Sequence, residues 1–156
     1  MRRRLPTPPP RALGALVLTL SVAVAACGSN PPGSQPASAS AGSGAVSGTL
    51  RDTAIELSPS TIGPGALTFS INNAGSTAHE FEVIALPAGT DGAALPVENH
   101  VVNTSANGLS VVDEVEEIAP STSTHLSVNL AAGSYVVICN IAGHYESGMH
   151  ATFTVG

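Results

Sequence analysis

Lysine and tryptophan are absent from this chain of 156 residues, and basic residues of any kind are rare. Of the five arginines, four lie before residue 12, so Arg51 is the only Lys or Arg that follows them. Eleven Asp and Glu residues stand against it, which gives residues 27–156 a formal charge of −10. Such a surface does not attract nucleic acid or anionic lipid, and an electrostatic partner should be basic.

Aromatic residues are also scarce, with three Phe and two Tyr. The sequence therefore predicts a core of Val, Ile, Leu and Ala. The length favours a single domain, and the roughly 110 residues of the patterned C-terminal part are enough to fold alone.

The first 27 residues have the pattern of a lipoprotein signal. Three arginines follow Met1, the apolar run 12–26 is short for a membrane span, and small residues precede Cys27. We expect 1–26 to be a signal peptide, Cys27 to be acylated and the protein to be held on the outer face of the cytoplasmic membrane. The alternative is an ordinary secretory signal that leaves Cys27 free. Residues 27–47, rich in Gly, Ser, Pro and Ala, predict a flexible tether before a folded domain at 48–156.

Only two cysteines occur, and acylation of Cys27 would leave Cys139 without a disulfide partner. Disulfides are common outside the cytoplasm, so a lone thiol there calls for a specific role. Metal binding supplies one.

Short segments with alternating or apolar patterns and turn residues between them predict an all-β fold of about seven or eight strands. One helical turn could form at 91–95, and 131–133 has the composition of a hairpin turn. The pattern indicates an antiparallel sandwich or a Greek-key barrel. The expected strands are 49–57, 66–71, 79–86, 111–118, 121–130, 135–138 and 151–155.

A thiolate, an imidazole and a thioether lie close together in Cys139-x4-His144-x4-Met149, which joins two expected strands. Soft sulfur ligands combined with imidazole suit copper. A blue-copper site needs a second imidazole, and the obvious donor is His79, which follows the turn 72–75. Gly143 and Gly148 would let the ligand loop close on the metal.

The same residue types also occur in simpler roles. Cys139 alone would more often be an inert core thiol, or it could be a nucleophile paired with His144. Zinc prefers harder or more thiolate-rich sets of ligands. His100 and His125 show no ligand spacing and are expected to be exposed.

The arrangement resembles the cupredoxin family, and its Cys-x4-His-x4-Met spacing is most similar to that of rusticyanin and the sulfocyanins. The resemblance covers roughly residues 46–156 and implies a cupredoxin-like Greek-key β-sandwich. It implies one type 1 copper ion held by His79, Cys139, His144 and Met149. Many cupredoxins have Asn or Asp directly after the first His, where it joins the two ligand loops, whereas this chain has Glu80.

Further residues are expected around the ligands. Glu80, Asn140 and His150 would lie just outside them, with the side chain of His150 on the opposite face of its strand. Ile141 and Ala142 would flank His144 at the edge through which electrons pass.

The acidic cluster Asp113, Glu114, Glu116 and Glu117 is either a solvated sheet face or a docking patch for a basic redox partner. The function expected from the resemblance is that of a monomeric electron carrier rather than an enzyme. The alternative is a copper-binding or copper-delivery lipoprotein without redox turnover. Met149 is the only methionine after the signal, which favours electron transfer, because a copper carrier would usually show clustered Met or His.

Overall fold

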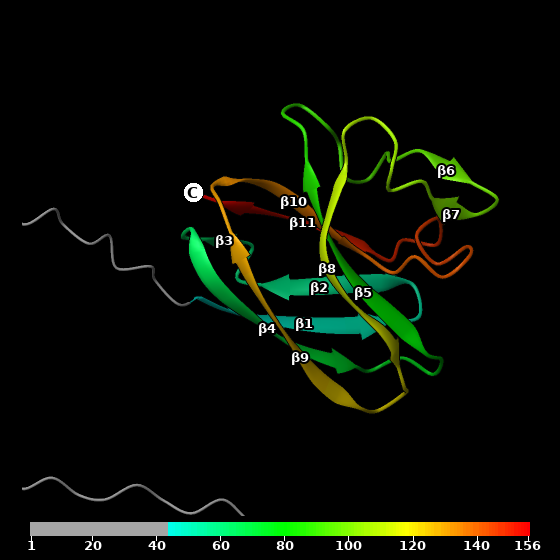
Figure 1. Ribbon diagram of the computed structural model, residues 1–156. Helices are drawn as coiled ribbons and strands as arrows, with labels where there is room; N and C mark the ends of the chain where they lie inside the picture. The colour runs from blue at the N-terminus through cyan, green and yellow to red at the C-terminus, as the bar shows by residue number, and fades with distance from the viewer. Residues whose placement is uncertain (1–43) are drawn as a thin grey trace, which may run out of the picture. The chain divides into compact units, whose positions relative to one another are not determined.

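The computed structural model describes residues 44–156, which form two main β-sheets and a small hairpin (Figure 1). The four-stranded sheet has the order β2-β1-β4-β9, and the five-stranded sheet has the order β3-β11-β10-β5-β8. The four-stranded sheet contains β1 (Gly44–Arg51), β2 (Ala54–Ser58), β4 (Gly65–Asn73) and β9 (Ser123–Leu130). The five-stranded sheet contains β3 (Thr61–Ile62), β5 (His79–Leu86), β8 (Ser110–Ile118), β10 (Gly133–Ile138) and β11 (His150–Val155). The hairpin is β6 (Val97–Glu98) with β7 (Val101–Val102).

The expected all-β class is confirmed for residues 44–156, which contain eight strands of five residues or more and three of two residues. Both main sheets are mixed, since β1 pairs in parallel with β4 and β11 in parallel with β3. The segment 91–95 is a turn, in which Ala94 N donates to Asp91 O over 3.1 Å, and not a helix. Within residues 44–156, no helix is long and apolar enough to span a membrane.

One predicted strand and one predicted hairpin turn are wrong. The segment 49–57 is not one strand, because the chain reverses at Asp52 and Thr53 and β1 pairs with β2 as a hairpin. The error arose because the loose alternation of apolar residues in 49–57 continues across the turn with no signal that marks it. The segment 131–133 is not a hairpin turn, because β9 and β10 belong to different sheets and the chain crosses between them there.

The folded part also begins earlier than Gly48. Gly44 to Ser47, which were expected in the tether, are already paired with β4 in strand β1. The predicted signal peptide and Cys27 lie outside the described residues.

The core between the sheets contains aromatic residues, which corrects the prediction of an aliphatic core. Phe69 lies 5.2 Å from Phe81 and 5.6 Å from Phe153 between ring centroids, and Tyr135 stacks on Phe153 at 5.3 Å. Large rings bury more apolar surface than any other side chain, so a few of them occupy the centre even when the chain has few to offer. Aliphatic residues of β1, β4 and β9 surround them.

Strands β5 and β10 are covered on both faces. Phe81 and Val83 point into the core between the sheets, whereas Ile84 and Ile138 belong to a second cluster on the outer side of the five-stranded sheet. That cluster is completed by Leu95, Val102 and Leu109 from the long insertion between β5 and β8, and by Tyr145 from the loop after β10. The insertion therefore covers the sheet beside the loop that carries Cys139 and His144.

Candidate metal centre

His79 is the first residue of β5 and is fully buried. The loop before it is organised by the buried side chain of Asn73, the last residue of β4. Its Nδ2 donates to Thr77 O and to Ile118 O, both over 2.8 Å, and its Oδ1 accepts from Gly75 N over 2.9 Å. The side chain of Asn73 thus joins the ends of β4 and β8 and directs the imidazole of His79 inward.

Cys139 directly follows β10, and the loop 140–149 returns the chain to β11. Cys139 N donates to Met149 O over 3.1 Å, and Met149 N donates to His144 O over 3.1 Å. These bonds close the loop on itself. Gly143 and Gly148 have φ values of 82° and 111°, so the backbone there is in the left-handed region that favours glycine, as the sequence predicted.

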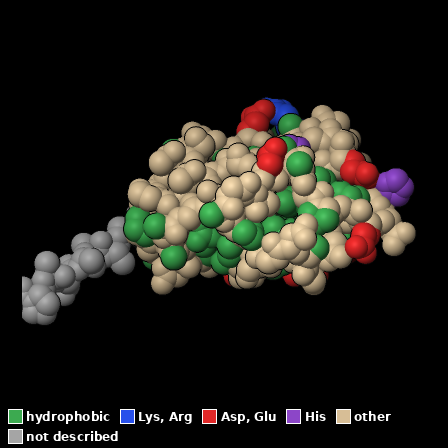
Figure 2. All heavy atoms as spheres, turned by 90° about the horizontal axis from the view of Figure 1, so that it is seen from above, with side chains coloured by type: hydrophobic (Ala, Val, Ile, Leu, Met, Phe, Trp, Pro, Cys, Tyr) green, Lys and Arg blue, Asp and Glu red, His purple; other side chains and the backbone are tan. Residues whose placement is uncertain are grey.

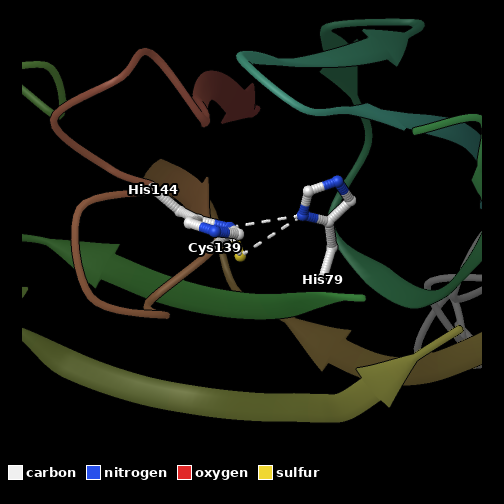
Figure 3. A group of neighbouring side chains, drawn as sticks. All are labelled: His79, Cys139 and His144. Carbon is white, nitrogen blue, oxygen red and sulfur yellow. Dashed lines mark hydrogen bonds between the residues drawn. The ribbon is translucent and has the colours of Figure 1, made fainter. Parts of the chain in front are cut away.

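Three side chains from these two segments point toward one another (Figure 3). His79 Nδ1 lies 3.3 Å from His144 Nδ1, Cys139 Sγ lies 3.3 Å from His144 Nδ1, and Cys139 Sγ lies 4.0 Å from His79 Nδ1. Met149 is fully buried in the same core cluster as Cys139. His79 and Cys139, which are 60 positions apart in the chain, are therefore brought together with His144.

The three atoms fit a metal ion. A circle through atoms separated by 3.3, 3.3 and 4.0 Å has a radius of about 2.1 Å, close to the roughly 2.0–2.3 Å at which nitrogen and sulfur ligands hold an ion such as Zn²⁺. One thiol and two imidazoles, with a thioether buried nearby, are softer than the usual zinc set and suit copper.

The electrostatics of the site favour a bound cation over an ionised thiol alone. Burial raises the pKa of the Cys139 thiol, although the N–H of Glu80, 3.3 Å from Sγ, works in the other direction. A coordinated metal removes the thiol proton and supplies the missing charge. Burial lowers the pKa of His79, which keeps its imidazole in the neutral form that binds metals.

One residue that touches this group was not predicted from the sequence. Asp52, in the turn between β1 and β2, has Oδ1 at 3.2 Å from Nε2 of His79. Its pKa is lowered to about 2, chiefly by the hydroxyl of Ser76 and then by the N–H of Ser76. No spacing in the sequence connects an exposed turn to a histidine 27 residues later, so only the folded chain shows this contact.

The insertion between β5 and β8 holds the ligand loop from outside. The side chain of Asn140 pairs with both backbone groups of Val102, with Oδ1 accepting over 2.8 Å and Nδ2 donating over 3.3 Å. Tyr145 Oη accepts from Leu95 N and donates to Gly92 O, each over 2.9 Å. Further along the loop, Gly143 N donates to His100 O over 2.8 Å. The loop is thus held on its outer side as well as at its two ends.

A family model described as the Sulfocyanin (SoxE) domain matches residues 65–156, which include His79, Cys139, His144 and Met149. The chain belongs to the sulfocyanin family of cupredoxins. Cupredoxins bind one copper ion and serve as electron carriers, and they generally work outside the cytoplasm. No curated protein matches this cupredoxin by sequence.

Solved structures support the fold. Auracyanin A, a "blue" copper protein from the green thermophilic photosynthetic bacterium Chloroflexus aurantiacus, has 17% identity and a TM-score of 0.52, over 74% of this chain and 100% of its own. Auracyanin B has 16% identity and a TM-score of 0.52, over 72% and 88% of the two chains. Reduced rusticyanin has 18% identity and a TM-score of 0.50, over 72% and 78%. The expected Greek-key β-sandwich of the cupredoxins is therefore confirmed.

The three residues that were expected just outside the ligands, Glu80, Asn140 and His150, each make a different kind of contact. Glu80 contacts Cys139 through its backbone N–H, and the side chain of Asn140 bonds the insertion at Val102. The ring of His150 packs on Tyr145, 5.0 Å away, and is not part of the group of His79, Cys139 and His144.

Among the remaining candidates, Ile141 is partly buried against the core and Ala142 is exposed beside His144. His100 and His125 are exposed, as expected, and His100 forms a 2.7 Å contact with Glu146.

A buried carboxyl group, Glu82, lies on the outer side of β5 and pairs in register with Glu114 of β8. Burial raises its pKa to about 7, and the nearby charges of Glu114 and Glu80 act in the same direction, opposed by a contact with Asn140. The folded protein therefore binds a proton at Glu82 that the unfolded chain, with the ordinary value of 4.5, releases earlier.

This difference predicts that Glu82→Gln stabilises the protein at neutral pH. Since the folded-state pKa is the higher one, the free energy of unfolding should fall as the pH rises from about 4.5 to about 7 in the wild type. Glu82→Gln should remove this fall and gain up to about 3 kcal/mol at pH 8, since each pKa unit corresponds to about 1.4 kcal/mol. Urea unfolding of the metal-free protein across this pH range measures it, with the exposed Glu117→Gln as control. An identical pH dependence in wild type and Glu82→Gln would contradict the assignment.

Proposed function

We propose that this protein is an electron carrier outside the cytoplasm, in which His79, Cys139, His144 and Met149 hold one copper ion. The observation that carries the proposal is the triangle of His79 Nδ1, His144 Nδ1 and Cys139 Sγ, whose size and donor chemistry fit copper. Copper would supply a one-electron couple between Cu(I) and Cu(II). The surrounding chain would hold the ligands in one geometry for both states, so that little moves when an electron passes.

Each ligand has a role that follows from its place. The imidazoles of His79 and His144, the thiolate of Cys139 and the buried thioether of Met149 would hold the copper ion, and the thioether, as the weakest of these donors, would tune the potential. The N–H of Glu80, 3.3 Å from Sγ of Cys139, would stabilise the thiolate without depending on the Glu80 side chain.

Electrons would pass through the edge formed by His144, Ile141 and Ala142. His79 is fully buried, whereas His144 is partly exposed and lies between the exposed Ala142 and the exposed Glu146. A partner can therefore approach the metal along His144 and not along His79.

An acidic surface lies close to that edge. Glu114 and Glu116 are exposed on β8, and the pKa of Glu80, the residue after His79, is raised first by burial and then by the charges of Glu116 and Glu114. Carboxylates of β8 therefore lie near Glu80, whose backbone N–H contacts Sγ of Cys139. Among the described residues Arg51 is the only Lys or Arg, and Figure 2 shows carboxylates around a band of apolar side chains on one face. This distribution supports a basic redox partner.

The first test concerns the metal. The Cu(II)-loaded protein should show an intense thiolate-to-copper band, and Cys139→Ser should abolish it, because the band needs a Cu–S bond. Met149→Leu should keep the band and raise the potential, since loss of a weak donor disfavours Cu(II). Visible spectra and redox titration measure both. A wild-type protein without the band would contradict the ligand assignment.

The second test concerns anchoring, which rests on the sequence around Cys27. Cys27→Ser should release the protein from membranes or leave its precursor unprocessed, because acyl chains would supply most of the membrane affinity. Fractionation of cells that express each form measures this. Processed Cys27→Ser protein that remains with the membrane would argue against lipid attachment.

The third test concerns docking. Reduction by a basic c-type cytochrome should slow as salt rises, over the range in which the Debye length falls from about 30 Å to about 8 Å. Replacing Glu114, Glu116 and Glu117 together by Gln should flatten this dependence if the cluster is the docking patch. Stopped-flow absorbance measures the rates.

The control compares two single variants that each remove one carboxylate. Glu116→Gln alters the proposed patch, whereas Glu56→Gln lies on β2 of the other sheet. Equal effects of the two variants would mean that net charge, and not this cluster, sets the rate. A copper band without measurable electron exchange would instead favour copper binding or delivery.

A further inference from the structure

Asp52 reaches the buried ligand His79 from a distant part of the chain. The residue lies in the turn between β1 and β2, and its side chain is 45% exposed while that of His79 is 0% exposed. The distance from Oδ1 of Asp52 to Nε2 of His79 is 3.2 Å. A carboxylate at the surface thus contacts the side of the imidazole that faces away from Cys139 and His144.

The carboxylate is fixed by other donors. Oδ2 of Asp52 accepts from the hydroxyl of Ser76 over 2.8 Å, and Oδ1 accepts from Ser76 N over 2.8 Å. The hydroxyl of Thr77 lies 3.3 Å from Oδ1, and its N–H lies 3.4 Å away. These contacts join the turn to the loop that delivers His79, and they leave the carboxylate little freedom to move away from the ring.

The surrounding backbone fits closely around this contact. A Cβ atom added at Gly75 would lie 2.5 Å from Oδ1 of Asp52 and 2.6 Å from Nε2 of His79. A Cβ atom added at Gly148 would lie 2.7 Å from the carbonyl oxygen of Thr53. The turn of Asp52 and Thr53 is therefore in close contact with the loop before His79 and with the loop that carries His144.

The chemistry of the contact determines the tautomer of His79. An ionised carboxylate only accepts hydrogen bonds, so Nε2 of His79 must carry the proton. Nδ1 then presents its lone pair toward Nδ1 of His144 and Sγ of Cys139. A carboxylate on the far nitrogen of a metal-bound imidazole orients the ring and makes the ligand more basic.

We propose that Asp52 is a positioning residue of the copper site, which holds the Nε2–H tautomer of His79 and whose negative charge favours oxidised copper. The inference rests on the proposed role of His79 as a ligand. Its direction follows from charge: Cu(II) carries one more positive charge than Cu(I), so a nearby carboxylate stabilises the oxidised state more and lowers the potential.

Two substitutions separate orientation from charge. Asp52→Asn keeps the size of the side chain and an acceptor oxygen but loses the negative charge. Asp52→Ala loses the acceptor oxygen as well as the charge. The matched control is Glu56→Gln. Glu56 follows the same turn, is exposed and pairs with Arg51. Its substitution therefore removes one negative charge close to the turn without touching His79. Thermal unfolding followed by circular dichroism checks that each variant of the full chain is folded.

The expected result is a higher potential for Asp52→Asn than for Glu56→Gln, with the blue band retained. Affinity for Cu(II) should fall about 10- to 100-fold, as is typical when a partner of a ligating histidine is lost, and affinity for Cu(I) should fall less. In the reduced protein, nitrogen NMR should show a slowly exchanging proton on Nε2 of His79 in the wild type, and faster exchange in Asp52→Ala. A change in fold alone would not produce this combination.

Other results would overturn the inference and can be told apart from failure of the proposed function. If Asp52→Asn and Glu56→Gln shift the potential equally and leave Nε2 exchange unchanged, Asp52 does not position His79. If the wild-type protein lacks the blue band, or His79→Gly retains it unchanged, the ligand assignment itself fails. A blue wild-type protein with unresponsive Asp52 variants contradicts only the role of Asp52.

Discussion

The structure depends on bringing two imidazoles and one thiol within 4.0 Å of one another in a place from which water is largely excluded. None of these groups attracts the others strongly when they are neutral. The arrangement must therefore be imposed by the surrounding chain. The side chain of Asn73 shapes the loop before His79, the bonds of Met149 close the loop of Cys139, and β5 and β10 are adjacent strands of one sheet. Such a preformed site suits a metal that changes its charge but not its ligands.

The most predictable parts were those with local signals. The strand that begins at His79 and the loop of Cys139, His144 and Met149 could be located because an apolar run, a turn and a fixed spacing all lie within a few residues. The candidate ligands could be grouped by the kind of donor atom that each offers, since few metals suit two imidazoles with two sulfur donors. Glu80 stands where many cupredoxins have Asn or Asp, and it contacts Sγ of Cys139 through its backbone N–H, a group that does not depend on the side chain at that position.

The parts that could not be predicted depend on contacts between distant segments. Asp52 lies in a hydrophilic turn, and the loose alternation from Thr49 to Leu57 concealed the turn itself. The aromatic core was missed for a related reason, because composition reports how many rings exist but not that Phe69, Phe81 and Phe153 meet. The part that the insertion plays in supporting the ligand loop was equally hidden. Its bonds to Asn140 and Tyr145 join residues 38 to 53 positions apart.

The contacts that hold the loop of His144 help to distinguish an electron carrier from a protein that delivers copper. A protein that hands over its metal must open the ligand set, and opening here would break many contacts at once. Backbone hydrogen bonds close the loop of His144 at both ends, and the side chains of Tyr145 and Asn140 bond it to the insertion on its outer side. At Gly148 the loop also lies in close contact with the backbone of Thr53. Buried hydrogen-bonding groups that lose their partners cost about 1–3 kcal/mol each, so opening the loop is expensive. Electron transfer requires no such opening, since a partner only needs to approach the exposed side of His144. The way the loop is held therefore favours a protein that retains its copper and exchanges electrons.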